Sequence, residues 1–178
     1  MSELIQNMMA LAQADLNATQ KHEPVDIKEV LDEVVNEFAP QARGKEQNLE
    51  FTSPTSHVQV NGDSLHLRQA FRNLLGNAIK YTPKGGLIQV QSVIEQGNLL
   101  VHFKDNGYGI PATDLPFIFN RFYRVRTGKA SEVEGNGLGL AIVKAITVEH
   151  NGSVNVESQA GKGSCFSITL PLLNNNFA

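Results

Sequence analysis

The sequence predicts an α+β fold, a two-layer sandwich in which one mixed sheet of about five strands carries helices on one face. Helical and strand-like segments follow one another without the strict alternation that is typical of a doubly wound parallel sheet. Each predicted helix has one apolar face, and the strands alternate apolar and polar residues. The chain has 178 residues, 41% of them hydrophobic, which is enough for one core.

Composition narrows the function classes. The formal net charge of −3 argues against nucleic-acid binding, because there is no overall basic excess to neutralise phosphates. The single cysteine, Cys165, excludes a disulfide framework and fits a reducing compartment. No stretch approaches the roughly 20 apolar residues of a membrane span, and no signal peptide is visible. We expect a cytoplasmic chain without direct membrane contact, and leave open whether a parent protein is membrane-anchored.

The N-terminal segment, residues 1–21, predicts an amphipathic helix. Its apolar residues recur at helical spacing: Leu4, Ile5, Met8, Met9, Ala12 and Leu16. Pro24 disfavours helical geometry in the residue before it, so the helix ends near residue 22. This helix either folds onto the main domain or belongs to a helical bundle whose partners lie elsewhere. We therefore expect an appendage over residues 1–22 and one domain over 23–178.

The second helix begins with strong local signals. Asp26 is a predicted N-cap, and Glu29 three residues later completes a capping box. Val25 and Val30 are spaced as a hydrophobic staple. We expect Gly44 to end the helix in the left-handed conformation. This helix is predicted to be scaffold.

Alternating patterns predict the strands, and turn residues separate them. Asn61-Gly62 is predicted to turn the chain into Asp63, the N-cap of the next helix. A further helix is expected from Leu138 to His150. The predicted strands are residues 48–52, 58–60, 87–95, about 99–105, 153–158 and 164–170.

The helix predicted from residue 64 to about residue 81 carries polar residues beside its apolar face. The spacing of Asn73, Asn77, Lys80 and Tyr81 places them along one edge. Two asparagines one turn apart require a reason, because asparagine is a poor helix former. They are either a satisfied surface pair or an edge where an amide oxygen binds Mg²⁺ and a lysine neutralises phosphate.

Two glycine clusters flank a basic segment. The alternation of Leu99, Val101 and Phe103 carries Asp105 onto the same inward face, just before Gly107 and Gly109. The second cluster leads into a helix N-terminus, whose free N–H groups suit an anion such as phosphate. The segment between them is predicted to be a lid over a nucleotide, with an aromatic patch and cations: Phe117, Phe119, Arg121, Phe122, Tyr123, Arg124, Arg126 and Lys129.

Four blocks, residues 73–82, 105–109, 117–124 and 135–140, together closely resemble the N, G1, F and G2 boxes of bacterial sensor histidine kinases. These boxes belong to the catalytic ATP-binding domain, a member of the superfamily that includes gyrase, Hsp90 and MutL. The resemblance implies a Bergerat-type sandwich over residues 23–178. It also implies that the N-terminal helix is the end of a dimerisation and histidine-phosphotransfer domain.

The resemblance assigns roles at both ends of a nucleotide. Asp105 would accept a hydrogen bond from the adenine amino group, and Gly107 and Gly109 would let the backbone approach the base. Asn77 would hold Mg²⁺, and Asn73 would support it.

At the other end, Lys80 and Tyr81 would border the phosphates and the ring. Gly137 and Gly139 would let the helix N-terminus meet the phosphates, and Arg124 would reach the γ-phosphate. The resemblance adds five further ATP-binding positions: Ile110, Phe122, Gly135, Leu138 and Leu140.

The resemblance also favours transfer over hydrolysis. Hydrolysing members of the superfamily carry a glutamate where this chain has Asn73, whose amide cannot act as a base. The acceptor would be a histidine, but His22-Glu23-Pro24 only imitates the acceptor motif, because Pro24 comes too early for a helix to continue. We expect a kinase module whose partners are a histidine-bearing dimerisation domain and the receiver domain of a response regulator. The alternative is a non-catalytic nucleotide-sensing or docking module.

Overall fold

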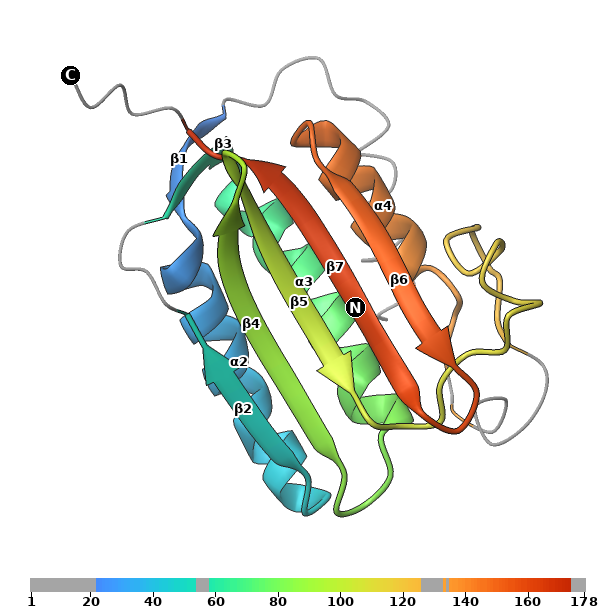
Figure 1. The fold of residues 1–178 in the computed structure, drawn as a ribbon. Helices are drawn as coiled ribbons and strands as arrows, with labels where there is room; N and C mark the ends of the chain where they lie inside the picture. Colours follow the sequence, from blue (N-terminus) through green and yellow to red (C-terminus); the bar gives the residue numbers. More distant parts are fainter. Residues whose placement is uncertain (1–21, 54–57, 126–132, 134, 174–178) are drawn as a thin grey trace.

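A computed structural model describes residues 22–53, 58–125, 133 and 135–173. These residues form a five-stranded mixed sheet with three helices on one face, and a small second sheet at one end (Figure 1). The predicted α+β sandwich is confirmed. The predicted N-terminal helix lies outside the described residues, so its assignment to an appendage stays a prediction.

The strand order of the main sheet is β2-β4-β5-β7-β6. The edge strand β2 (Asn48–Thr52) runs parallel to β4 (Leu87–Glu95), and the other pairs are antiparallel. The strand β5 (Asn98–Asp105) lies in the centre, followed by β7 (Gly163–Pro171) and β6 (Ser153–Gln159). The register pairs the last residue of β5 with the second residue of β7, which brings two distant segments together at one end of the sheet.

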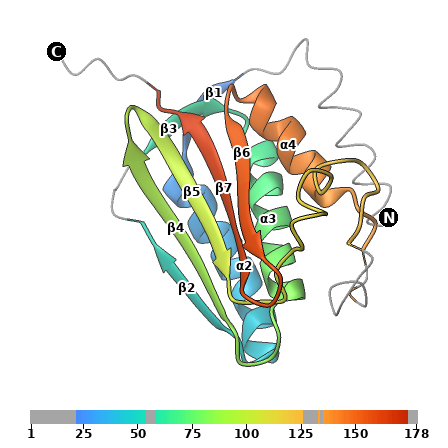
Figure 2. The same ribbon diagram turned by 45° about the vertical axis from the view of Figure 1, so that its right-hand side comes forward.

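Three helices cover the same face of this sheet (Figures 1 and 2): α2 (Ile27–Gly44), α3 (Ser64–Tyr81) and α4 (Gly139–Glu149). The central helix α3 packs between the other two. Its Phe71 meets Phe103 of β5 with ring centroids 5.9 Å apart, and both side chains are fully buried. The core therefore lies between α3 and the centre of the sheet, which holds the polar edge of α3 above the end of β5.

A two-stranded sheet was not predicted. β1 (Glu23–Asp26) pairs antiparallel with β3 (Gln59–Gly62), with Val25 opposite Val60. Asn61-Gly62 is therefore part of a strand, and the prediction of a turn there was wrong. The reason is tertiary, because the hydrogen-bonding partner of each short strand lies far away in the sequence.

Both predicted N-caps are confirmed, but the predicted end of α2 is not. The Asp26 carboxylate accepts hydrogen bonds from two first-turn N–H groups of α2, and Asp63 does the same for α3. The predicted stop at Gly44 was wrong, because Gly44 is the last helical residue and Glu46 takes the left-handed conformation, with φ of 54°. The Glu46 and Gln47 N–H groups donate to carbonyls of the last turn, at 2.9 Å each, as in a Schellman motif.

A buried histidine closes the core far from the carboxyl end of β5. His150, 2% exposed, donates from Nδ1 to the Ile146 carbonyl at 2.7 Å and accepts from the Asp63 N–H at Nε2, 2.9 Å away. The second bond requires a neutral ring, and burial lowers the pKa of His150. This side chain therefore links the end of α4 to the start of α3.

Candidate functional site

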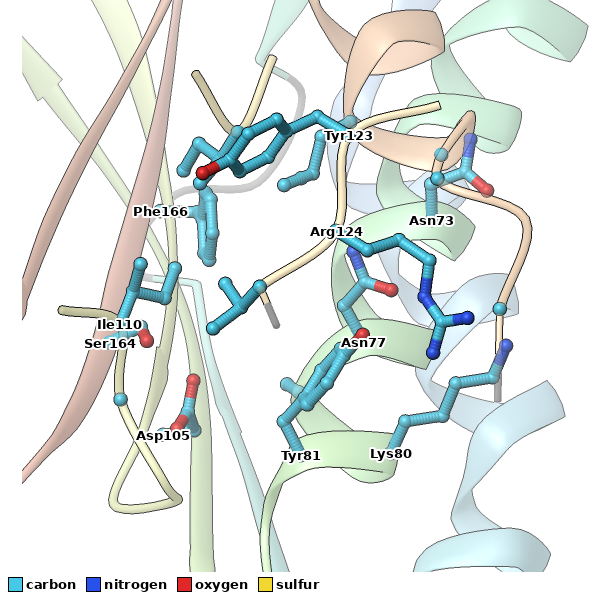
Figure 3. Close-up of a pocket in the computed structure, with 18 of the residues that line it drawn as sticks. Asn73, Asn77, Lys80, Tyr81, Asp105, Ile110, Tyr123, Arg124, Ser164 and Phe166 are labelled. Atoms are coloured by element: carbon cyan, nitrogen blue, oxygen red, sulfur yellow. The ribbon is translucent and has the colours of Figure 1, made fainter. Parts of the chain in front are cut away.

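A cavity opens between α3, the end of β5 and the N-terminus of α4 (Figure 3). In the figure, Asp105, Ser164 and Ile110 lie on one side, Lys80 and Arg124 on the other, and Asn77 and Tyr81 between them. The cavity brings together twelve of the predicted site residues: Asn73, Asn77, Lys80, Tyr81, Asp105, Gly109, Ile110, Arg124, Gly135, Gly137, Gly139 and Leu140.

Asp105 is the buried acid of the site. The strand period aims it inward, and its side chain is 8% exposed at the end of β5. One carboxylate oxygen accepts a hydrogen bond from the Gly107 N–H at 2.8 Å. Burial raises the pKa of Asp105, while hydrogen bonds from the backbone N–H groups of Gly107 and Ser164 partly offset this rise. The carboxylate therefore offers fixed acceptor oxygens to the cavity.

The polar edge of α3 forms the middle of the cavity wall. The Asn73 amide nitrogen is buried and has no hydrogen-bond partner in the part of the chain that the structure describes. The Asn77 side chain lines the same wall one turn later. Burial raises the pKa of Tyr81, and the nearby Arg124 guanidinium lowers it. This edge therefore combines the two amide groups with the ammonium group of Lys80, and Arg124 from a separate segment lies nearby.

The glycines after β5 are required by close backbone packing. A Cβ at Gly107 would lie 2.4 Å from the Tyr81 carbonyl oxygen, and Gly107 does not line the cavity. Gly109, with φ of 65°, does line it, and its missing Cβ would lie 2.0 Å from the Gln159 carbonyl oxygen. In this structure, Gly107 therefore serves the packing of the loop against α3, rather than the cavity surface.

The predicted lid segment is described up to residue 125 and again at residue 133. Arg124 donates to the Val133 carbonyl oxygen at 2.6 Å, which holds it beside the glycine-rich turn. Phe122 has a positive φ of 63° and is 64% exposed, so it does not line the cavity as predicted. Its N–H bonds the Gly137 carbonyl at 2.9 Å, so its backbone supports the turn. The predicted lid cations Arg126 and Lys129 lie outside the described residues.

The glycine-rich turn leads into α4 as predicted. Gly137 has φ of 71°, and a Cβ there would lie 2.7 Å from the Phe122 backbone. The Asn136 side chain accepts from the Leu138 N–H at 3.0 Å. Leu138 is fully buried in the core and does not line the cavity, unlike the prediction. The N-cap residue Leu138 makes no side-chain capping hydrogen bond, and Gly139 and Leu140 at the start of α4 line the cavity, so the first N–H groups of this helix lie at the cavity.

Sequence reasoning missed part of the lining. Ser164 and Phe166 of β7 line the cavity beside Asp105. The remaining lining residues are Ala78, Ile118, Tyr123, Val125 and Asn136. In β7, Ser164 and Phe166 share the buried face of the strand, but only the pairing of Asp105 with Ser164 places this strand at the site. That pairing depends on strand order, which local patterns do not encode.

A metal ion has few protein ligands here. The described residues contain no group of three or more histidines, cysteines or carboxylates suited to a metal. The Asn77 amide oxygen fits a site that would share Mg²⁺ with phosphate oxygens and water, as Mg²⁺ prefers. Within the described ranges, no helix is long and apolar enough to cross a membrane.

Comparison with known proteins gives concordant matches. A family model described as "Histidine kinase-, DNA gyrase B-, and HSP90-like ATPase" matches residues 62–174. The sensor protein RprX of Bacteroides fragilis (strain YCH46) is 39% identical over 165 residues, which cover 89% of this chain and 31% of RprX. The sensor histidine kinase CusS of Escherichia coli (strain K12) is 38% identical over 172 residues, 96% of this chain and 35% of CusS. The chain thus spans about a third of the length of these curated relatives.

Solved structures agree. The mycobacterial sensor histidine kinase MprB superposes with a TM-score of 0.72 at 35% identity, covering 85% of this chain and 97% of that one. Full-length ShkA in complex with AMPPNP gives a TM-score of 0.82 at 26% identity, over 95% of this chain and 35% of ShkA. The chain therefore belongs to the histidine kinase-, DNA gyrase B- and HSP90-like ATPase family and matches the catalytic domains of its sensor histidine kinases.

Proposed function

We propose that this domain binds Mg-ATP and transfers the γ-phosphate to a histidine of a dimerisation and phosphotransfer domain, in two-component signal transduction. The observation that carries the proposal is one cavity with a buried acid on one side and two cations on the other. A nucleotide has the matching asymmetry, because its base carries hydrogen-bond donors and its phosphates carry negative charge. The family to which the chain belongs uses ATP.

At the base end, Asp105 accepts a hydrogen bond from the 6-amino group of adenine. An acceptor-only group suits this donor and disfavours the 6-oxo group of guanine. Ile110 and Phe166 supply apolar surface on the same side of the cavity. This apolar surface and the buried Asp105 carboxylate together orient the base.

At the phosphate end, Lys80 and Arg124 neutralise charge, and the first N–H groups of α4 point at the phosphates. Gly137 and Gly139 keep this surface free of side chains. Phosphoryl transfer depends mainly on positioning and on charge stabilisation, which these groups provide.

Asn77 is the residue that would hold Mg²⁺, and Asn73 is its neighbour one helical turn earlier. The unpartnered Asn73 amide nitrogen is a donor available for a ligand oxygen or a water. When bound, Mg²⁺ would offset phosphate charge beside this edge. Because Asn73 lacks a carboxylate, the site has no general base there, and the proposal is transfer rather than hydrolysis.

The acceptor is an imidazole, which is neutral at pH 7 and attacks without a strong base. It belongs to a dimerisation domain, and a response regulator receiver domain accepts the phosphate afterwards. We assign the reaction to the cytoplasm, where ATP is available.

Calorimetric titration with a non-hydrolysable ATP analogue tests the binding step, with and without Mg²⁺. The GTP counterpart is the control. Saturable, adenine-selective and Mg²⁺-dependent binding supports the proposal. Absence of binding in a folded sample would refute it and favour the docking alternative. Transfer is then tested by adding a histidine-bearing dimerisation domain and following labelled phosphate into acid-labile phosphohistidine.

A further inference from the structure

Two segments interlock at the base end of the cavity. The hairpin between β6 and β7 lies against the loop that follows β5, and glycines allow the contact. A Cβ at Gly163, which has φ of 93°, would lie 2.0 Å from the Asp105 carbonyl oxygen. The Gly161 N–H donates to the Tyr108 carbonyl oxygen at 2.7 Å. The hairpin is therefore held close to the acid that faces the base.

Ser158, on β6, fastens the same junction through its hydroxyl group. Its Oγ lies 2.8 Å from the Ile110 backbone nitrogen, 2.8 Å from the Gly163 carbonyl oxygen and 2.9 Å from Ser164 Oγ. A hydroxyl has one hydrogen to donate and two lone pairs to accept with. The carbonyl can only accept, and the backbone N–H can only donate. All three contacts are hydrogen bonds only if Ser158 donates to Gly163 and Ser164 donates to Ser158.

This assignment determines how Ser164 faces the cavity. Its only hydroxyl hydrogen points to Ser158, so its lone pairs are what remains for a ligand. Ser164 lines the cavity beside Asp105, and Figure 3 shows the two side chains close together on the same side. The base end of the cavity then presents acceptors from both side chains.

We propose that Ser158 is a positioning residue for base selectivity, which keeps the Ser164 hydroxyl in its acceptor orientation. The inference rests on the proposed ATP site. Adenine presents an amino group to these acceptors, whereas guanine presents an oxygen that finds no donor there. Without Ser158, the Ser164 hydroxyl is free to turn and donate to the guanine oxygen.

The test compares the affinities of non-hydrolysable ATP and GTP analogues by calorimetry. Ser158→Ala removes the hydroxyl, and Ser158→Cys replaces it by a larger thiol that forms only weak hydrogen bonds. Each should reduce the ATP-over-GTP preference about tenfold, the effect of about one hydrogen bond. Ser158→Thr keeps the hydroxyl and should retain the wild-type preference for the ATP analogue. Ser167→Ala is the matched control, because Ser167 lies on β7 but bonds His102 outside the cavity.

The ratio separates selectivity from structure. Loss of the hydrogen bond to the Ile110 N–H loosens the loop and weakens the binding of both nucleotides alike. The ratio of the ATP-analogue affinity to the GTP-analogue affinity then stays unchanged. An unchanged ratio in folded Ser158→Ala and Ser158→Cys variants would overturn the inference. If the wild-type domain itself binds ATP and GTP equally or not at all, the proposed function fails instead.

Discussion

Replacing Asp105 by asparagine separates binding from folding in one substitution. The side chain keeps its shape but loses its charge and gains an NH₂ group. One carboxylate oxygen already accepts from the Gly107 N–H at 2.8 Å, and a backbone N–H of Ser164 also bonds this carboxylate. An asparagine has only one oxygen. When that oxygen keeps the backbone N–H donors, the NH₂ group is left to face the adenine amino group, and both of these groups are donors.

The expected loss of affinity for the ATP analogue follows from the hydrogen bond between the Asp105 carboxylate and the adenine amino group. A hydrogen bond to a charged group contributes about 1.5–3 kcal/mol, so the ATP analogue should bind about 10- to 150-fold more weakly. The assay is calorimetric titration at pH 7. Asp32→Asn is the matched control and should bind as the wild type does, because Asp32 is a partly exposed residue of α2 that pairs with Lys28 and does not line the cavity. Unchanged affinity in folded Asp105→Asn would refute the assignment of the base end.

The same Asp105→Asn substitution should not weaken folding, although it weakens nucleotide binding. Burial raises the pKa of Asp105, so the folded state binds the proton more tightly than the unfolded state. The ionised carboxylate therefore opposes folding above its folded pKa, and this opposition disappears as the pH falls through that pKa. We expect Asp105→Asn to be at least as stable as wild type at pH 7, with the difference shrinking toward pH 4 in urea unfolding. A variant that loses several kcal/mol at pH 7 contradicts this reasoning.

Three further substitutions probe the rest of the molecule. Asn77→Ala should abolish the Mg²⁺ dependence of ATP-analogue binding in the same titration, whereas Asn48→Ala, on the exposed edge of β2, should retain it. Gly163→Ala should destabilise the fold by about 2–4 kcal/mol in urea unfolding, because its Cβ would lie 2.0 Å from the Asp105 carbonyl oxygen. An unfolding midpoint equal to that of the wild type would show that the two segments move apart without cost. Burial lowers the pKa of His150, so below about pH 6.5 this side chain takes up a proton in the unfolded chain but not in the folded one, and the wild type loses stability. His150→Gln should remove this loss. Equal slopes between pH 5 and pH 7 in both proteins would contradict the last prediction.

Much of the fold was predictable because its signals are local. The carboxylates of Asp26 and Asp63 cap helices a few residues away, and the period of β5 alone carries Asp105 inward. The helical spacing of Asn73 and Asn77 places both on one wall of the cavity. Each of these predictions needs only the geometry of one element.

Other features depended on distant partners. The pairing of β1 with β3 overrode the turn expected at Asn61-Gly62. Glu46, and not Gly44, took the left-handed position at the end of α2, where the following Gln47 side chain is buried and donates to the Ile79 and Thr82 carbonyls at the end of α3. Phe122 does not line the cavity although the next two residues, Tyr123 and Arg124, do, since its backbone conformation is set by contact with the glycine-rich turn.

The sequence by itself determined the helices, their N-caps, the strands of the main sheet, the inward acid and the glycine clusters, because these follow from spacing along one chain segment. Only the tertiary structure decided that Ser164 stands beside Asp105, and that Ser158 orients it. Those contacts join strands that are sequence-distant from the acid, and their hydrogen-bond directions depend on three partners meeting at one hydroxyl. The sequence could not place these residues together because local patterns leave strand order and register open.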